Sequence, residues 1–574
     1  MSHYSFYRQC MSYLTSREQR DYYLVLVLGV MSAMGELLGL ASIVPVITVI
    51  TGSEMPVYMD QLTEYTSHDL AVSTLGALCI LTLILSAIIN ATYSFARNRY
   101  AMRVGARLST AAIRNYLSQD PVLFWSRSEA EFSRNIGDVG GRVSMGVVQN
   151  SLHMVSRFAL TAIAAAGLLW INPLLTVAIC LTLAVLYTLI HVSIKNYIQV
   201  ATLTIFSDSK FLHRTKINSY KAFRLAKISG AENYVADIFS HYRKRSARLS
   251  ANISIMGELP KNVIETAGLV VLVVMALIMD RSIVSDKIIP NMSIFALAAY
   301  RILPSLQQIF QGYNNLTAVK ALEPTIANAL EEKIDNKISA KAMTNGAEKT
   351  QFNILELKTL SFSYLASGRE LFKSLNQKME LKGVWVLQAP SGAGKSTLFD
   401  LLMGFQRPIK GSVQVDGVNL ADLKNEWWEN ISYVPSSYVS FGSSLKSEVS
   451  FGRVGEVDNH RLKVALDVSG FSDVMNRHNL TVDSSLDCLD LSSGEESRLM
   501  IARALYRGAN ILFMDEALSK LDLLSAKAVL SAIQEEYTGM CLFIVTHRIE
   551  ELSDVNYQSI LLTSDSSKVV ERVE

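Results

Sequence analysis

Residues 384–403 read Val-Trp-Val-Leu-Gln-Ala-Pro-Ser-Gly-Ala-Gly-Lys-Ser-Thr-Leu-Phe-Asp-Leu-Leu-Met, and this stretch decides the fold of the carboxy-terminal half of the chain. It begins with a short apolar run, which predicts a buried strand, and it ends with a run that predicts a helix. The loop between them follows the pattern G-x-x-x-x-G-K-[ST], except that Ala389 replaces the first glycine. Such a loop turns backbone N–H groups around a phosphate, aided by the amino terminus of the following helix. The stretch therefore predicts a phosphate-binding loop in an α/β domain.

Individual residues of the loop have predicted roles. Lys395 would reach the β and γ phosphates of a nucleotide, and Ser396 would hold Mg²⁺. The glycines give the backbone the freedom that the turn requires. The alternative is a chance glycine-rich turn, in which strand, Lys-Ser pair and helix fall in register by coincidence. The predicted nucleotide contacts of this loop are Ser391, Gly392, Gly394, Lys395, Ser396 and Thr397.

A second apolar run, Ile511-Leu-Phe-Met-Asp-Glu516, ends in two carboxylates. Asp515 would orient Mg²⁺ through water, and Glu516 would polarise the attacking water as a general base. Alone, this pattern is weak, because loops often contain carboxylates. Its position downstream of a phosphate-binding loop makes it strong.

Residues 490–495, Asp-Leu-Ser-Ser-Gly-Glu, precede Ile501-Ala-Arg-Ala504 and the carboxylate strand. In that position they resemble the signature motif of the ATP-binding cassette family, usually Leu-Ser-Gly-Gly-Gln. Ser493 and Glu495 differ from the usual residues. Ser492 and Gly494 remain at the start of a predicted helix, where a hydroxyl and backbone N–H groups can face a γ-phosphate. Without their context these residues would be an ordinary helix cap.

Further residues between 355 and 550 resemble the same family. Tyr364 stands where the family stacks an aromatic ring on adenine, and Asp522 lies in a segment like the loop that crosses the dimer interface. His547 matches the switch histidine that contacts the γ-phosphate. Ser436 replaces a glutamine that reaches Mg²⁺ and the attacking water, and a serine side chain is too short to do both. The resemblance implies an ATP hydrolase that uses ATP and Mg²⁺, with Ser436 as its main departure.

The resemblance also implies a dimer. In this family the phosphate loop of one cassette faces the signature motif of another, and each chain supplies one of each. A complete site therefore needs two chains. The partner would be a second copy of this chain or a related half-transporter.

The composition indicates a membrane protein. Half of the 574 residues are hydrophobic and only 18% are charged, and the mean hydropathy is +0.24. A soluble chain of this composition would need an unusually large core, whereas lipid-facing helices account for it directly. The net charge of +2, without a basic patch interleaved with aromatic residues, argues against a nucleic-acid partner. The five cysteines have no metal-ligand spacing.

Six segments are apolar enough to cross a bilayer, which takes about 20 residues of helix. The connections after the second and fourth segments are rich in arginine and lysine, whereas Thr51–Leu70 has none. Both long connections, the amino terminus and the carboxy-terminal half are therefore predicted to be cytoplasmic. The predicted spans are Tyr22–Ile50, Ala71–Phe95, Met145–Trp170, Leu174–Val192, Val263–Met279 and Met292–Phe310.

The two long connections predict helices that continue about 20 residues beyond the bilayer and meet at turns. This arrangement resembles the exporter class of the family, in which such turns touch the cassettes, here near Asp120–Arg127 and Asn218–Arg224. The predicted fold is thus an all-α six-helix transmembrane domain of the exporter type followed by an α/β P-loop nucleotide-binding domain. We expect the transmembrane domain at residues 1–325, a polar linker at 326–351 and the cassette at 352–574.

Short stretches at Glu36–Pro45, Leu259–Glu265 and Ala299–Pro304 resemble bacterial half-transporters that flip lipid-linked oligosaccharides. Such a lipid carries a pyrophosphate, so its cavity should hold cations. The candidate substrate residues are Arg301, Lys261 and Arg157, because charges in membrane helices need water or a counter-charge. The alternative is that Arg301 pairs with Glu36 or Glu265 only to hold helices together.

The favoured function is ATP-driven export or flipping of an amphipathic substrate, most specifically a lipid-linked oligosaccharide, by alternating access in a dimer. One alternative is an exporter of peptide, drug or plain lipid. Another is a non-transporting regulatory half of a heterodimer. The resemblance places the chain in the bacterial inner membrane as a multi-pass protein with a cytoplasmic cassette, in contact with the lipid bilayer and without nucleic acid.

Overall fold

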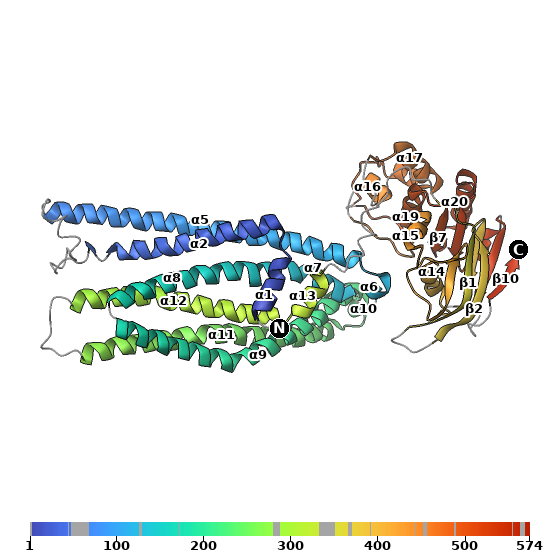
Figure 1. Cartoon of the computed structure of the whole chain (residues 1–574). Coiled ribbons are helices and arrows are strands. Elements are labelled where there is room, and N and C mark those ends of the chain that lie inside the picture. Colours follow the sequence, from blue (N-terminus) through green and yellow to red (C-terminus); the bar gives the residue numbers. More distant parts are fainter. Residues whose placement is uncertain are drawn as a thin grey trace. The chain divides into compact units, whose positions relative to one another are not determined.

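The computed structural model describes residues 3–43, 45–46, 68–125, 129–171, 173–278, 288–331, 350–364, 370–390, 392–441, 444–451, 456–486, 489–553, 555–562 and 569–573. The chain forms two compact units (Figure 1). Unit 1 comprises residues 1–117 and 127–333, and unit 2 comprises residues 118–126 and 334–574. The second unit thus includes a short segment from the amino-terminal half of the sequence.

Unit 1 is built from helices. Its described elements are α1 (His3–Ser12), α2 (Ser16–Ala41), α5 (His68–Leu117), α7 (Glu129–Val143), the π-helix η1 (Ser144–Gln149), α8 (Asn150–Ile171), α9 (Pro173–Lys221), α10 (Phe223–Ile228), α11 (Glu232–Ile278), α12 (Ile288–Lys320) and α13 (Glu323–Leu330). The six predicted spans lie on α2, α5, α8 with η1, α9, α11 and α12. Residues 44, 47–50 and 279 of two predicted spans lie outside the described residues.

Three helical stretches in the described part are apolar and long enough to cross a membrane: Ser16–Ala41, Ser73–Leu117 and Asn135–Trp170. Large apolar side chains on the second stretch remain exposed within the chain, as expected for a surface that lipid covers. The exposed residues of this stretch include Ile80, Leu81, Ile84, Leu85 and Ile88.

The longest helices of unit 1 have more residues than a bilayer crossing requires. Helix α5 has 50 residues and α9 has 49. At 1.5 Å per residue each spans roughly 75 Å, against about 30 Å of hydrocarbon. The short helix α10 joins α9 to α11, so the prediction of long helices that meet at a turn is confirmed for this pair. That the pair projects from a membrane stays a prediction.

Helix α1 is held in the core of unit 1. Phe6, Cys10 and Leu14 are almost completely buried and pack in one apolar cluster with α2, α5 and α13. The Tyr7 hydroxyl donates to the Tyr22 hydroxyl at 3.0 Å, which lies 3.0 Å from the Ser151 Oγ. These contacts fasten the amino terminus to α2 and α8.

The predicted linker begins later than residue 326. Helix α13 covers residues 326–330, and Ile326, Ala329 and Leu330 are buried in the core of unit 1. Asn115 of α5 donates to the Ala329 carbonyl at 3.2 Å. The sequence predicts a linker from residue 326 onward, because its polar residues show little periodicity. In the structure, the apolar face of α13 packs on α5, which is distant in the sequence.

Unit 2 contains two sheets. An antiparallel sheet has the order β2-β1-β4-β5, and a six-stranded sheet has the order β10-β9-β3-β8-β7-β6, parallel except for β10. The strands are β1 (Ile354–Ser363), β2 (Glu370–Glu380), β3 (Val384–Gln388), β4 (Lys410–Val415), β5 (Val418–Asn419), β6 (Ile431–Val434), β7 (Ile511–Asp515), β8 (Cys541–Val545), β9 (Tyr557–Leu562) and β10 (Val569–Val573).

Helices cover both faces of the six-stranded sheet. Alternate residues of β3 show this directly, because Val384 and Val386 pack into one apolar cluster while Trp385 and Leu387 pack into the other. A strand buried on both faces reads as a continuous apolar run, as this one does. The helical elements of the unit are α6 (Pro121–Trp125), α14 (Lys395–Leu402), α15 (Lys424–Asn430), α16 (Leu445–Ser450), α17 (Asn459–Val468), α18 (Phe471–Arg477), α19 (Ser493–Arg507), η3 (Leu518–Lys520), α20 (Leu523–Glu536) and η4 (Ile549–Leu552).

One close helix contact in unit 1 depends on glycine. A Cβ atom on Gly140 of α7 would lie 2.5 Å from the Gly105 carbonyl oxygen of α5. Backbone atoms cannot yield as a flexible side chain can. The neighbouring Gly141 has no atom within 4 Å of its Cβ position.

We therefore expect Gly140→Ala to lower the thermal midpoint of the purified full-length chain, because overpacking costs about 1–3 kcal/mol. Gly141→Ala is the matched control. It should leave the midpoint unchanged or raise it, because alanine is a better helix former than glycine by about 1 kcal/mol. Equal midpoints for the two variants, measured by intrinsic fluorescence in nanodiscs, would contradict the close contact.

Candidate functional site

The predicted phosphate-binding loop lies between β3 and α14. Gly392 and Gly394 have φ angles of +80° and +98°, which favour glycine. A Cβ on Gly394 would also lie 2.9 Å from the ring of Phe372. Lys395 donates from Nζ to the Ala389 carbonyl at 2.9 Å, so its ammonium folds back over the loop. Ser391 lies outside the described residues.

Parallel strand pairing brings two other segments to the same edge of the sheet. Strand β8 pairs with both β3 and β7, so the residues that follow these three strands are neighbours. Glu516 follows β7 with a φ of +54°, and its N–H donates to the Val545 carbonyl at 3.0 Å. This backbone turn directs Glu516 toward the segment that carries His547.

His547 connects the lysine and the glutamate. Its Nε2 lies 2.9 Å from Lys395 Nζ and 3.3 Å from Glu516 Oε1. In one tautomer this nitrogen accepts from the lysine, and in the other, or when the ring is charged, it donates to the glutamate. Three predicted site residues from distant parts of the sequence thus meet at one point.

Two further carboxylates, those of Asp515 and Asp400, interact electrostatically next to Glu516. Burial raises the pKa of Asp515, with a further rise from Glu516 that Lys395 partly offsets. Burial and the neighbouring Asp515 raise the pKa of Asp400 to about 6. A divalent cation would relieve this repulsion, and oxygen donors such as Asp515 and the Ser396 hydroxyl are of the kind that Mg²⁺ prefers. Asp400 escaped the sequence analysis, although a carboxylate inside the apolar run 398–403 was a visible signal.

A cation at this site would depend on ligands from outside the described side chains. Within the described residues, no group of three or more His, Cys, Asp and Glu side chains is placed to bind a metal. Mg²⁺ sites commonly use one or two protein ligands together with substrate phosphates. The arrangement therefore fits a cation whose remaining ligands are the phosphate oxygens of a bound nucleotide.

Tyr364 lies beside the loop, whereas Ser436 follows β6, which β8 and β7 separate from β3. The Tyr364 ring is 41% exposed, and its hydroxyl lies 2.9 Å from Thr397 Oγ1 on α14. An exposed ring held beside the phosphate loop can stack on a base. Ser436 is exposed and follows β6, at the same edge of the sheet as the carboxylates.

Ser492 and Asp522 are helix caps in this chain. The Ser492 Oγ accepts from Glu495 N, and the Glu495 carboxylate accepts from Ser492 N, forming a capping box at the start of α19. Gly494 lies near Lys520, whose carbonyl oxygen would be 3.4 Å from an added Cβ. Asp522 accepts from Ser525 N at 3.0 Å at the start of α20, and its hydrogen bonds with Ser525 lower its pKa.

Helix α6 packs on the cassette within unit 2. Asp120 and Arg407 form an ion pair at 2.9 Å, and the rings of Trp125 and Phe405 meet edge to face at 5.3 Å between centroids. The prediction that the turn near Asp120–Arg127 touches the cassette is confirmed for the described residues up to Trp125. The sequence analysis missed Phe405 and Arg407, which are ordinary loop residues until α6 lies against them.

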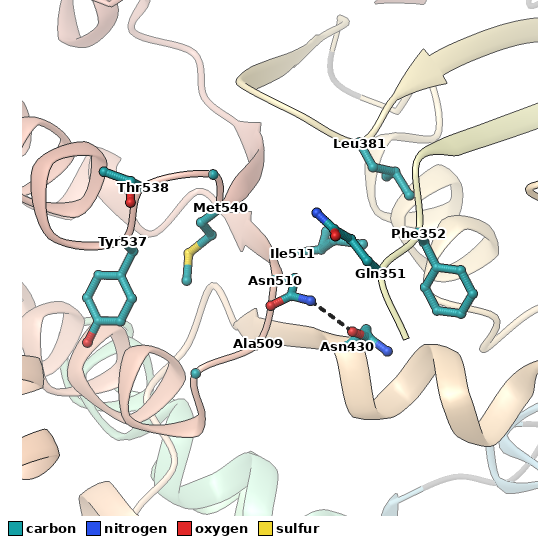
Figure 2. Close-up of a pocket in the computed structure, with 12 residues that line it drawn as sticks. Gln351, Phe352, Leu381, Asn430, Ala509, Asn510, Ile511, Tyr537, Thr538 and Met540 are labelled. Atoms are coloured by element: carbon teal, nitrogen blue, oxygen red, sulfur yellow. Dashed lines mark hydrogen bonds between the residues drawn. The ribbon is translucent and has the colours of Figure 1, made fainter. Parts of the chain in front are cut away.

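A pocket of about 480 Å³ opens at the other edge of the sheet (Figure 2). Asn510 donates to Asn430 at 3.1 Å beside it, and Phe352, Tyr537 and Met540 contribute to its lining. The pocket adjoins the starts of β3 and β7, near Leu381 and Ile511. Ligands of parallel sheets bind at the carboxyl ends of strands, so this pocket is not the nucleotide site.

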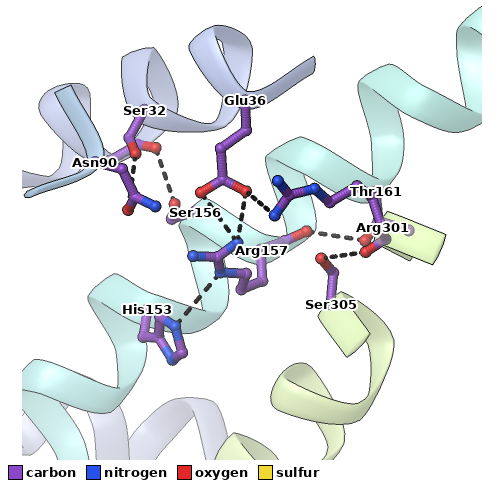
Figure 3. Close-up of polar contacts among 10 residues, drawn as sticks. Ser32, Glu36, Asn90, His153, Ser156, Arg157, Thr161, Arg301 and Ser305 are labelled. Carbon is purple, nitrogen blue, oxygen red and sulfur yellow. Dashed lines mark hydrogen bonds and ion pairs between the residues drawn. The ribbon is translucent and has the colours of Figure 1, made fainter. Parts of the chain in front are cut away.

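A charged cluster joins three helices of unit 1 (Figure 3). Glu36 of α2 pairs with Arg157 of α8 at 3.1 Å and with Arg301 of α12 at 3.6 Å. Arg157 also approaches His153, with 3.4 Å between Nε and Nε2. The side chains of Glu36 and Arg157 are 5% and 15% exposed, whereas that of Arg301 is 41% exposed.

The cluster contains two of the three predicted substrate residues. Arg157 and Arg301 are together, and the predicted alternative partner Glu36 lies between them. Lys261 lies on α11, but its side chain and that of Glu265 lie outside the described residues. The structure thus brings two of the three predicted substrate residues to one place.

Comparisons with known proteins agree with this architecture. Residues 372–519 match the ABC transporter family. The fold is that of a bacterial Atm1-family ABC exporter solved with ATP bound, with a TM-score of 0.77, 17% identity, and 97% of this chain and 95% of that chain covered. The predicted fold class is thereby confirmed.

Curated relatives give a second set of similarities. The chain is 26% identical over 344 residues to the ATP-dependent lipid A-core flippase of Ralstonia nicotianae, which covers 58% of this chain and 57% of that protein. It is 24% identical over 372 residues to the protein of the same name from Burkholderia orbicola, covering 64% and 60%. It is 30% identical over 220 residues to the mitochondrial potassium channel ATP-binding subunit of Xenopus tropicalis, covering 36% and 31%. The chain therefore spans less than two thirds of the length of these relatives.

The cluster geometry predicts an order of stability among its variants. Glu36→Gln leaves the buried Arg157 without a compensating charge, and breaking a buried ion pair costs about 3–5 kcal/mol. Arg301→Gln removes a partly exposed charge and should cost less than about 1 kcal/mol. We expect a much lower thermal midpoint for Glu36→Gln than for Arg301→Gln in nanodiscs, and equal shifts would show that Glu36 does not compensate Arg157.

Proposed function

We propose that this chain, which has the fold of an ABC exporter and contains an ABC transporter domain, hydrolyses ATP to move an amphipathic substrate across a membrane as a dimer. The observation that carries the proposal is the convergence of Lys395, Glu516 and His547 on a chain that also contains long, exposed apolar helices. A soluble ATPase would not need such helices, and a passive membrane protein would not need such a site.

The chemistry assigns a role to each residue of the site. The loop from Gly392 to Thr397 would bind the phosphates of ATP through its backbone and Lys395, which would exchange Ala389 and His547 for phosphate oxygens. Glu516 would orient and polarise the attacking water. His547 would contact the γ-phosphate, and the exposed ring of Tyr364 would stack on adenine. Ser396 and Asp515 would hold Mg²⁺, which neutralises charge on the phosphates.

The dimer follows from how the site is divided. Ser492 and Gly494 begin α19, while the phosphate loop begins α14, and each chain has one of each. In a pair of chains, the amino terminus of α19 from one would close over the phosphates bound by the other, and Asp522 would lie at the interface. The partner is a second copy or a related half-transporter.

Two surfaces suit the transmission of motion from the cassettes to the membrane-spanning helices. Helix α6 is already packed on the cassette through Trp125. Helix α10 and its flanks expose Tyr220, Phe223, Leu225 and Ile228, a set of large apolar side chains that a cassette would cover. Closing of the cassettes on ATP would thus move both cytoplasmic turns and reorient the spans between inward and outward openings.

For the cargo we propose an anionic glycolipid, most specifically a lipid-linked oligosaccharide. In the part of the chain that the structure describes, Glu36 pairs with two guanidiniums, those of Arg157 and Arg301, which are groups that bind phosphate well. Arg301 is the more exposed cation and would meet a phosphate first, with Arg157 and Lys261 in support. The name of the lipid A-core flippases agrees with a lipid cargo. We place the protein in the bacterial inner membrane, with its cassette in the cytoplasm.

A second candidate function rests on Ser436. A serine cannot replace the glutamine that links Mg²⁺, water and the transmembrane domain in the family. The chain could then be the regulatory half of a heterodimer, whose isolated form would not hydrolyse ATP. An exporter of peptide, drug or plain lipid is a further alternative, and it would respond equally to anionic and neutral cargo.

The first test is ATP hydrolysis by the purified chain in lipid nanodiscs. We expect Glu516→Gln to lower kcat by at least about 100-fold, because general bases contribute about 10²–10⁴. Glu535→Gln changes an exposed carboxylate on α20 and serves as the matched control, with turnover near that of wild type. If wild type and both variants are equally silent, the homodimeric ATPase is wrong and the heterodimer is favoured.

The second test concerns the cargo. We expect an extracted lipid-linked oligosaccharide to stimulate ATP hydrolysis, and Arg301→Gln to raise its half-maximal concentration by about tenfold, since a charge-assisted hydrogen bond contributes about 1.5–3 kcal/mol. Arg243→Gln changes an exposed arginine of α11 and is the control. Equal stimulation by a neutral glycolipid such as monogalactosyl diacylglycerol would instead favour a plain-lipid exporter.

A further inference from the structure

Glu495 is a carboxylate in a position that has to approach phosphates. It belongs to the first turn of α19 and is 8% exposed. The proposed dimer would bring this turn against the triphosphate held by the partner chain. A buried negative charge there would repel the phosphates, because charges interact strongly where water is excluded. The chain therefore needs a means to offset this charge.

The structure divides the two oxygens of Glu495 between different partners. Oε2 accepts the backbone N–H of Ser492 at 3.0 Å, which closes the capping box. Oε1 faces two basic side chains, with Arg477 Nη2 at 3.2 Å and His478 Nε2 at 3.4 Å. The carboxylate is thus turned toward the end of α18 by one oxygen and held at its own helix by the other.

The charges of the two helices favour the same arrangement. Arg477 lies in the last turn of α18, where the helix dipole favours a cation, and Glu495 lies in the first turn of α19, where it favours an anion. The hydrogen bond from Ser492 N lowers the pKa of Glu495 most, and burial opposes it. The carboxylate therefore remains ionised, so its charge has to be offset rather than removed by protonation.

We propose that Arg477, assisted by His478, is a positioning residue for ATP hydrolysis that neutralises Glu495 and so lets the start of α19 bind the γ-phosphate of the partner chain. This role rests on the proposed ATP-dependent dimer. Arg477 does not contact the nucleotide; it acts through Glu495. The ion pair replaces, in electrostatic terms, the neutral glutamine that occupies the same place in the family's usual signature.

The role predicts that Arg477 matters only while Glu495 is charged. Without the arginine, the buried carboxylate would weaken the approach of the phosphates. With a neutral glutamine at position 495 the arginine would have nothing to offset. An effect of Arg477 that does not act through the charge of Glu495, such as packing of its side-chain stem, would instead be the same in both backgrounds.

The experiment follows amide hydrogen exchange of residues 492–497 in the full-length chain in nanodiscs, with ATP titrated and with Glu516→Gln present to prevent turnover. We expect Arg477→Ala to raise the ATP concentration for half-maximal protection by about tenfold, equivalent to about 1.4 kcal/mol. Arg477→Lys should restore most of the affinity. Lys463→Ala, an exposed cation on α17, is the matched control and should leave the concentration unchanged.

The double variant decides between the outcomes. Loss of the Arg477→Ala effect in a Glu495→Gln background would support the role. A shift of the same size in both backgrounds, or no difference between Arg477→Ala and Lys463→Ala, would overturn it while leaving the ATP-dependent dimer intact. Absence of any ATP-dependent protection in the parent would overturn the dimer itself, and the role of Arg477 with it.

Discussion

The parallel pairing of β3, β8 and β7 is the constraint on which the rest of the cassette depends. Because the three strands run side by side in the same direction, the segments after residues 388, 515 and 545 end at one edge of the sheet. Each strand is buried on both faces, and its alternate side chains pack into two different apolar clusters, so a shift in register would place every side chain in the wrong cluster. Lys395, Glu516 and His547 are therefore positioned by the core rather than by contacts with one another.

In unit 1, the arrangement of the helices depends on apolar surfaces and on one buried charged cluster. Its helices form their backbone hydrogen bonds internally, as a bilayer requires, and the described part of α5 exposes large apolar side chains such as Leu81 and Ile84. The exception is the cluster of Glu36, Arg157 and Arg301, which is costly to bury in such surroundings. Among the described residues, this cluster links α2, α8 and α12 through one carboxylate and two guanidiniums.

At two helix starts, the glutamate of a capping box also forms an ion pair with an arginine. At the start of α2, Glu18 shares its oxygens between the backbone of Thr15 and the guanidinium of Arg107. At the start of α19, Glu495 shares its oxygens between the backbone of Ser492 and Arg477. The first fixes a helix to its neighbour. The second lies in a segment that resembles a nucleotide-binding signature, and there we propose that the same ion pair also offsets the charge of Glu495.

The sequence by itself determined the features that are local. The phosphate loop, the strand that ends in Asp515 and Glu516, and the helices at the six spans follow from patterns a few residues to one helix long, and local propensity and hydrophobic periodicity decide them. Only the tertiary structure decided that Glu36 lies between Arg157 and Arg301, that Asp400 lies beside Asp515, and that α13 and α6 find their partners on distant segments. These contacts join residues tens to hundreds of positions apart. In a single sequence, several charged residues and apolar helix faces are equally plausible as contact partners. Packing of the folded chain decides which of them are buried against each other.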